Sequence, residues 1–279
     1  MSATFSIHVH ADGSKKAYEI FGQEHLGKQT PLVLVNGMSM LRGDWLKLSD
    51  ALSQYRPVAL NWKKVAICGY SMGGAITQQL LFLPFHPSNP AALPFEVSHV
   101  FLTATLCEPQ QDTSFAKRFQ SIPPPPEGRK RTFEEKREVA RPTTAATFDP
   151  NWIAENPDRF NWWLDRMATG GRPVRTILMQ ARALGRFDFT EFQAKVPKDT
   201  KILVIHGKLD EVLPYSASRV ILERMPSAKD VEVGDKPGQI PSLDFGHQWF
   251  EYFDIEVWRN VFEVFLSEPP AQSSGLARL

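Results

Sequence analysis

Ser71 is the residue whose type and setting most clearly point to chemistry. It is the centre of a G-x-S-x-G sequence, Gly69 to Gly73, that follows the apolar, β-branched run Val65–Cys68 and precedes an apolar segment from Ala75 to Leu83. The first run predicts a buried strand and the second a helix. A serine at such a tight corner is forced into a strained backbone conformation with positive φ. Its hydroxyl then stands at the positive end of a helix, where a developing oxyanion is stabilised.

A G-x-S-x-G sequence also arises by chance in loops, but chance matches rarely carry a strand before them and a helix after them. The local context resembles the nucleophile elbow of the α/β-hydrolase fold family. The resemblance implies an α/β fold, in which a mostly parallel sheet is flanked by helices. A serine at the elbow is similar to the esterase branch, and Ser71-Met72-Gly73-Gly74 with Asn36-Gly37 resembles the enol-lactonase-like branch.

The same resemblance assigns two partners to Ser71. Asp210 follows the predicted strand Lys201–Gly207, where the family carries its acid, and His247 precedes the predicted helix Ile255–Leu266, where the family carries its general base. The order serine, aspartate, histidine is the one expected of this fold. The alternatives are that Asp210 caps a helix and that His247 has a capping or surface role. His206 is expected only to shape the acid loop.

The resemblance also implies an oxyanion hole. After the predicted strand Pro31–Val35, the residue that follows a loop glycine usually donates its backbone N–H, which here is Met38 behind Asn36-Gly37. Met72, after the nucleophile, would supply the second N–H, and one such donor is worth about 10²–10³ in rate. The alternative is that Asn36-Gly37 forms an ordinary turn.

The sequence pattern of residues 108–194 differs from that of the flanking segments, and we expect a helical lid there. Residues 1–107 and 195–279 would then form the core. Helices are predicted at 133–140, 152–167 and 174–184. Trp162, Trp163 and Met167 fall near one helical face, where they would either contact substrate or pack the lid onto the core.

One connection is too short for the resembled fold. Asn61–Lys64 alone joins a predicted strand at Arg56–Leu60 to the elbow strand, although a parallel crossover needs a dozen or more residues. Four residues span at most about 14 Å, less than the return along one strand. We therefore expect the Arg56–Leu60 strand to be lost or rerouted, or the chain to be a shortened form, with one sheet face losing helical cover.

Composition excludes several classes of partner. The formal net charge of +1 gives no reason to expect nucleic acid or an anionic membrane. Cys68 and Cys107, the two cysteines, are expected as buried free thiols of a reducing compartment. His8 and His10 would share a strand face without a third ligand, so we expect no metal, and no cofactor.

The ends of the chain suggest a location. No signal peptide and no membrane-spanning run are apparent, which favours the cytoplasm. The last residues, Ala277-Arg278-Leu279, resemble a peroxisomal address.

The sequence therefore predicts a serine hydrolase that acts on a small carboxylic ester, a lactone or a related acyl substrate. The alternative is a non-catalytic or defective binding member of the same fold, which the short connection motivates.

Overall fold

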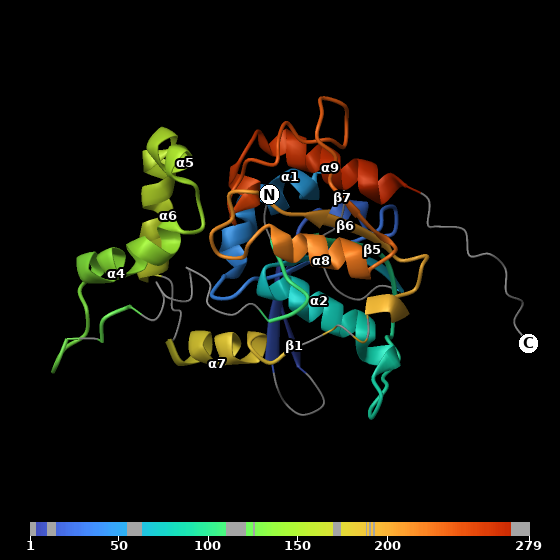
Figure 1. The fold of residues 1–279 in the computed structure, drawn as a ribbon, viewed down its shortest axis with the longest axis horizontal. Coiled ribbons are helices and arrows are strands. Elements are labelled where there is room, and N and C mark those ends of the chain that lie inside the picture. Colours follow the sequence, from blue (N-terminus) through green and yellow to red (C-terminus); the bar gives the residue numbers. More distant parts are fainter. Residues whose placement is uncertain are drawn as a thin grey trace, which may run out of the picture.

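A parallel sheet of five strands forms the centre of the computed structural model (Figure 1). The structure describes residues 4–9, 15–54, 63–109, 121–124, 126–169, 174–187, 189, 191 and 193–268. From edge to edge the strands are β3 (Leu32–Val35), β4 (Lys64–Tyr70), β5 (Glu96–Thr103), β6 (Lys201–Ile205) and β7 (Ala228–Asp230). All pair in parallel, as their apolar, β-branched runs predict, and the predicted fold class is confirmed.

Helices cover both faces of this sheet. Along β5, Phe101 packs toward α9, where its ring stacks on Phe262 with centroids 4.0 Å apart, whereas Val100 and Leu102 belong to the core on the opposite face. This alternation follows from the period of two in a strand. Side chains of α1 (Leu46–Ser53) and α9 (Ile255–Ser267) lie in the first core, and side chains of α2 (Met72–Phe82) and α8 (Ser216–Arg224) in the second.

The route from β3 to β4 bears on the short connection. The two strands are direct neighbours, paired from Leu32 opposite Ala66 to Val35 opposite Gly69, and α1 lies between them in the chain. A full helix thus accompanies this parallel crossover. The predicted strand Arg56–Leu60 lies outside the described residues, so its fate stays a prediction. The predicted loss of helical cover also stays a prediction, because it depends on the same residues; in the described part of the chain, helices pack on both faces of the sheet.

An N-terminal hairpin is separate from the main sheet. Strands β1 (Thr4–Val9) and β2 (Lys15–Ile20) pair antiparallel and form a sheet of two strands. At the far edge of the main sheet, β7 ends at Asp230, and Val233 forms an isolated bridge with Ile240.

Between β5 and β6 the chain forms α4 (Phe133–Ala145), α5 (Pro150–Glu155), α6 (Pro157–Thr169) and α7 (Val174–Leu184). Figure 1 shows α4, α5 and α6 to one side of the sheet. The prediction of one helix over 152–167 is wrong: Asp149 caps α5 and the helix stops at Asn156, since Pro157 has no N–H to continue it. The boundaries 108 and 194 of a lid stay a prediction.

Short 3-10 turns complete the described elements: η1 (Gln23–His25), η2 (Arg42–Trp45), η3 (Leu83–Phe85), η4 (Gln193–Lys195) and η5 (Trp249–Glu251). Cys68 and Cys107 are buried and free, as predicted. Across the described residues, we find no helix of the length and apolarity that a bilayer crossing requires. His10 and Ala277–Leu279 lie outside the described residues, and His8 has no described side chain. The metal and peroxisomal predictions at these positions stay untested.

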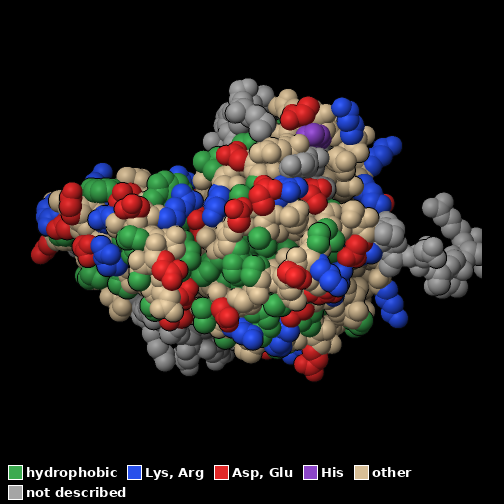
Figure 2. All heavy atoms as spheres, turned by 90° about the horizontal axis from the view of Figure 1, so that it is seen from above, with side chains coloured by type: hydrophobic (Ala, Val, Ile, Leu, Met, Phe, Trp, Pro, Cys, Tyr) green, Lys and Arg blue, Asp and Glu red, His purple; other side chains and the backbone are tan. Residues whose placement is uncertain are grey.

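The surface mixes both signs of charge. Figure 2 shows Lys and Arg side chains interspersed with Asp and Glu over the face it presents, including the side formed by the α4–α6 helices. This mixture agrees with the small net charge of the chain.

Candidate active site

Ser71 stands at a strained corner between β4 and α2. Its backbone has φ 54° and ψ −121°, which is the positive φ predicted for a serine in this position. Two bonds to β5 and its exit hold the corner. The Ser71 N–H donates to the Thr103 carbonyl at 2.9 Å, and the Thr105 hydroxyl donates to the Ser71 carbonyl at 2.6 Å. The strain is therefore held in place by the neighbouring strand.

The loop that leaves β3 lies directly against this corner. A Cβ added to Gly37 would come within 3.1 Å of Cβ of Ser71, and one added to Gly73 within 2.1 Å of the Val35 carbonyl oxygen. Only glycine allows two backbone segments to approach so closely. This packing brings Met38 to the cavity at Ser71, and Met72 opens the helix that follows. Their N–H groups stay the expected oxyanion donors.

Asp210 lies in the loop after β6, with its side chain fully buried. Its Oδ1 accepts from the N–H groups of Val212 and Leu213 at 2.8 and 2.9 Å. Its Oδ2 lies 2.7 Å from Nδ1 of His247 and 3.1 Å from Nε2 of His206. The loop aspartate thus caps its own turn through one oxygen and faces two imidazoles through the other.

These neighbours decide the ionisation of Asp210. Burial by itself raises the pKa of this carboxyl group, but the charge of His247 and the hydrogen bonds from both histidines outweigh it. The net effect is a pKa of Asp210 well below its ordinary value. The side chain is therefore a carboxylate at neutral pH.

His247 connects Asp210 to Ser71. Its Nε2 lies 3.1 Å from Oγ of Ser71, and its ring packs against Tyr70 with centroids 5.1 Å apart. The imidazole is buried, with 4% exposure. Because an ionised carboxylate only accepts, Nδ1 carries the proton toward Asp210 and leaves Nε2 free to accept from the serine hydroxyl. The structure thus brings the three predicted residues together in one hydrogen-bonded chain.

The loop that carries His247 is held by the α4–α6 region. The Gln248 N–H donates to the Thr147 carbonyl at 3.1 Å, and the Asp149 N–H donates to the Tyr252 hydroxyl at 2.9 Å. Trp152 Nε1 donates to the Glu251 carbonyl at 3.3 Å. The imidazole is therefore positioned from a part of the chain that the sequence assigned to a lid.

A small cavity of about 110 Å³ opens at Ser71. Trp163 and Met167, which the sequence offered as substrate contacts, both line it. Sequence reasoning missed the rest of the wall, although the run of threonines on α4 was a visible signal. These additional residues include Ser39, Met40, Asp44, Tyr70, Thr143, Thr144, Thr147, Ile177, Val212 and Gln248.

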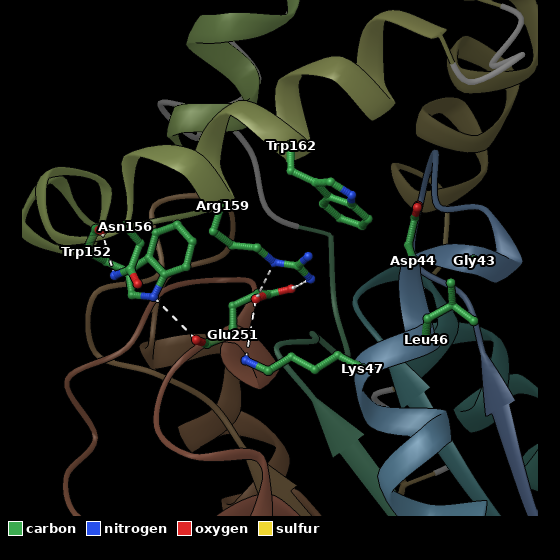
Figure 3. A pocket seen from close by; sticks show the side chains of 9 residues that line it. All are labelled: Gly43, Asp44, Leu46, Lys47, Trp152, Asn156, Arg159, Trp162 and Glu251. Carbon is green, nitrogen blue, oxygen red and sulfur yellow. Dashed lines mark hydrogen bonds and ion pairs between the residues drawn. The ribbon is translucent and has the colours of Figure 1, made fainter.

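Trp162 lies elsewhere. It lines a neighbouring cavity of about 500 Å³ between α6 and the core, drawn in Figure 3. The guanidinium carbons of two arginines lie close to the centroid of its ring, at 4.0 Å for Arg159 and 4.8 Å for Arg166. The prediction that Trp162 contacts substrate beside Ser71 is not supported by its place, because one helical residue turns the side chain by about 100° from Trp163.

Buried acidic side chains tie α6 to the core around this second cavity. The Glu251 carboxylate binds Arg159 at 2.6 Å and Lys47 at 3.5 Å (Figure 3). It also accepts a hydrogen bond from Nε1 of Trp163 at 3.2 Å. Asp44, which lines both cavities, binds Arg166 at 2.6 Å. The spacing of the two arginines on α6 places them on one face, a signal that sequence reasoning overlooked.

Fold and elbow together define the chain as an α/β hydrolase. Residues 25–238 match the family described as serine aminopeptidase, S33, and the chain belongs to that family. The matched segment includes Ser71 and Asp210 but ends before His247. No match was found among curated proteins.

Solved structures share this fold at low sequence identity. A hydrolase from Pseudomonas aeruginosa PA01 superposes with a TM-score of 0.69 at 16% identity, over 95% of this chain and 98% of that one. The enol-lactonase from Burkholderia xenovorans LB400 superposes with a TM-score of 0.67 at 16% identity, over 94% of this chain and 100% of that one. An esterase from Exiguobacterium antarcticum superposes with a TM-score of 0.66 at 15% identity, over 95% of this chain and 100% of that one. At these identities the likeness establishes the fold alone.

Proposed function

We propose that the chain is a serine hydrolase that cleaves a small carboxylic ester, a lactone or a related acyl substrate. The observation that carries the proposal is the hydrogen-bonded chain of Ser71, His247 and Asp210, with separations of 3.1 and 2.7 Å. The esterase and the enol-lactonase among the structural neighbours are compatible with it.

The mechanism follows from the proton positions. His247 Nε2 takes the hydroxyl proton as Ser71 Oγ attacks the carbonyl carbon. Asp210 stabilises the imidazolium through Nδ1, and the N–H groups of Met38 and Met72 hold the oxyanion. The imidazolium then gives its proton to the leaving oxygen. Water repeats the sequence and releases the acyl group from Ser71.

The cavity at Ser71 supports a short acyl group. A volume of about 110 Å³ has room for only a few heavy atoms, and Trp163, Met167 and Ile177 present apolar walls. The neighbouring cavity of about 500 Å³ offers space for a larger leaving group. We therefore expect acetyl to butyryl esters to be preferred over octanoyl esters.

The name of the family raises the alternative of peptide cleavage at a free amino terminus. Such a site needs a carboxylate to bind the ammonium group. Among the described residues that line the cavity at Ser71, Asp44 is the one carboxylate, and Arg166 already binds it at 2.6 Å. This pairing favours an uncharged acyl group over an amino-terminal residue.

Turnover of p-nitrophenyl esters tests the proposal, with Ser71→Ala as the matched variant. We expect Ser71→Ala to lower kcat by about 10⁴-fold or more, since the nucleophile is removed. Ser216→Ala, at the start of α8, should leave the rate unchanged. A fluorophosphonate probe should label the wild type at Ser71.

Equal rates for wild type and Ser71→Ala would overturn the nucleophile assignment. Soluble, folded wild type without labelling would favour the non-catalytic binding protein. Faster cleavage of an alanine p-nitroanilide than of any ester would favour the peptidase.

A further inference from the structure

We propose that His206 is a positioning residue of the active site, whose Nε2–H orients the Asp210 carboxylate toward His247. The inference rests on the proposed function, because it assigns a role to the support of the same three residues. His206 has no place in the mechanism above, since it touches neither Ser71 nor the cavity beside it.

The geometry places one N–H between two acceptors. His206 Nε2 lies 3.1 Å from Oδ2 of Asp210 and 3.1 Å from the carbonyl oxygen of Leu213. Leu213 also donates its own N–H to Oδ1 of Asp210 at 2.9 Å. The imidazole thus closes a ring of contacts around the turn that presents the acid.

The partners define the tautomer of His206. A carbonyl oxygen and a carboxylate only accept, so Nε2 carries the proton. Nδ1 is buried and has no hydrogen-bond partner among the described residues. A proton on Nδ1 would be a buried donor without an acceptor, so the neutral ring with Nε2–H is the form that fits the site.

Four N–H donors then surround Asp210. Val212 and Leu213 hold Oδ1, while His206 and His247 share Oδ2. Three of these donors come from the acid's own loop and strand end. These three donors fix the plane of the carboxylate. The lone pair of Oδ2 that remains then points toward Nδ1 of His247.

Water is poorly placed to replace this donor. The side chains of His206 and Asp210 are both fully buried, and the His206 ring meets the edge of Tyr215 with centroids 6.1 Å apart. Among the described residues, two further titratable groups lie beside the pair, Tyr70 and Tyr215. Burial raises the pKa of both phenols, so both stay neutral over the pH range of an assay.

Loss of the His206 donor has two consequences. The carboxylate gains freedom to rotate, which displaces His247 from Ser71. A carboxylate with fewer donors is also more basic, so it holds the imidazolium form of His247 more strongly. A packing defect alone would lower the rate but would not move the pH dependence.

The experiment compares wild type, His206→Leu and His206→Gln by the rate of fluorophosphonate labelling at Ser71 between pH 5 and 9. In parallel, the histidine signals of the ¹⁵N-labelled proteins are titrated by NMR, with His247→Gln to identify that ring. The Gln amide offers an N–H near the place of Nε2. His206→Met replaces the Leu variant if thermal unfolding shows that the latter does not fold.

We expect His206→Leu to label about ten-fold or more slowly, because a misplacement of 1 Å costs up to about 10²-fold. The acidic limb of its labelling profile and the titration of His247 should both move to higher pH. His206→Gln should restore the labelling rate and return the acidic limb of the profile to its wild-type position. A wild-type rate and profile in a folded Leu variant would overturn the proposal. So would slower labelling with an unmoved titration and no rescue by Gln. If the wild type is not labelled, the proposed function fails, and the NMR titration still decides the role of His206.

Discussion

Two regions of the molecule hold the three groups of the proposed mechanism, and they do so by different means. Ser71 and Asp210 follow the parallel strands β4 and β6, where backbone bonds to Thr103 and from Val212 fix them within the core. His247 lies in residues 231–254, between β7 and α9, where the regular structure is one short 3-10 turn and a single bridge. The sheet therefore positions two of the three groups but not the third.

The third group is positioned by the helices that the sequence assigned to a lid. The loop of His247 donates a hydrogen bond to the Thr147 carbonyl and accepts hydrogen bonds from Asp149 and Trp152. Glu251 in the same loop binds Arg159 of α6. The α4–α6 region thus supports the imidazole as well as roofing the cavity. A change in these helices should reach the chemistry through His247, whereas a change beneath β4 or β6 should reach it through Ser71 or Asp210.

The largest effect is expected in the part held by the sheet. Asp210→Asn removes the charge that stabilises the imidazolium and replaces an acceptor with an amide, so kcat for p-nitrophenyl ester cleavage should fall about 10³–10⁴-fold. Asp244→Asn, at an exposed position in the loop before His247, should leave kcat unchanged. A loss below ten-fold in Asp210→Asn would show that the imidazole is held mainly by the α4–α6 region.

Acid should also weaken the part held by the sheet. The pKa of Asp210 is lower in the folded protein than its ordinary value, so the folded state binds fewer protons near that value. The lowered pKa of Asp210 therefore adds on the order of 2 kcal/mol to the free energy of unfolding above about pH 4. This contribution is lost progressively as the pH falls further. Urea unfolding between pH 6 and 3 checks this. Wild type should lose more stability than Asp210→Asn, and equal slopes would contradict it.

A smaller effect is expected where the α4–α6 region meets the loop of His247. Glu251→Gln leaves Arg159 and Lys47 without their carboxylate, and both are about one-third exposed, so solvent softens the loss. The free energy of unfolding should fall by about 1–3 kcal/mol, and kcat about ten-fold, with KM little changed. Glu256→Gln breaks the exposed pair with Arg259 and should cost less than about 1 kcal/mol. Unchanged kcat in Glu251→Gln would contradict the proposed link between the α4–α6 region and His247.

Adjacent tryptophans give the finest test of the boundary between the two cavities. Trp163→Phe removes the bond from Nε1 to Glu251 and opens the wall of the Ser71 cavity, so stability should fall by about 1 kcal/mol and longer acyl chains should be tolerated. Trp162→Phe weakens contacts with Arg159 and Arg166 by about 0.5–1 kcal/mol and should leave the chain-length preference unchanged. A shift in preference by Trp162→Phe alone would reverse the assignment of the cavities.

Much of the fold could be predicted because it depends on local pattern. The β-branched run before Ser71 and the glycines around it require a buried strand and a tight corner, and the structure has both. The break between α5 and α6 was equally readable from Pro157, which cannot donate to the preceding turn, but the aromatic periodicity of 152–167 concealed it. The expected loss or rerouting of the strand Arg56–Leu60 stays a prediction, because these residues lie outside the described ranges.

The sequence by itself determined the corner at Ser71, because positive φ, small neighbours and the start of a helix are requirements of adjacent residues. The family resemblance named Asp210 and His247, and the structure brings both within hydrogen-bonding distance of their expected partners. Tertiary structure alone decided that His206 shares Asp210, and that Trp162 and Trp163 face different cavities. Such contacts depend on how loops and helix faces meet after folding, and spacing along the chain does not encode that meeting.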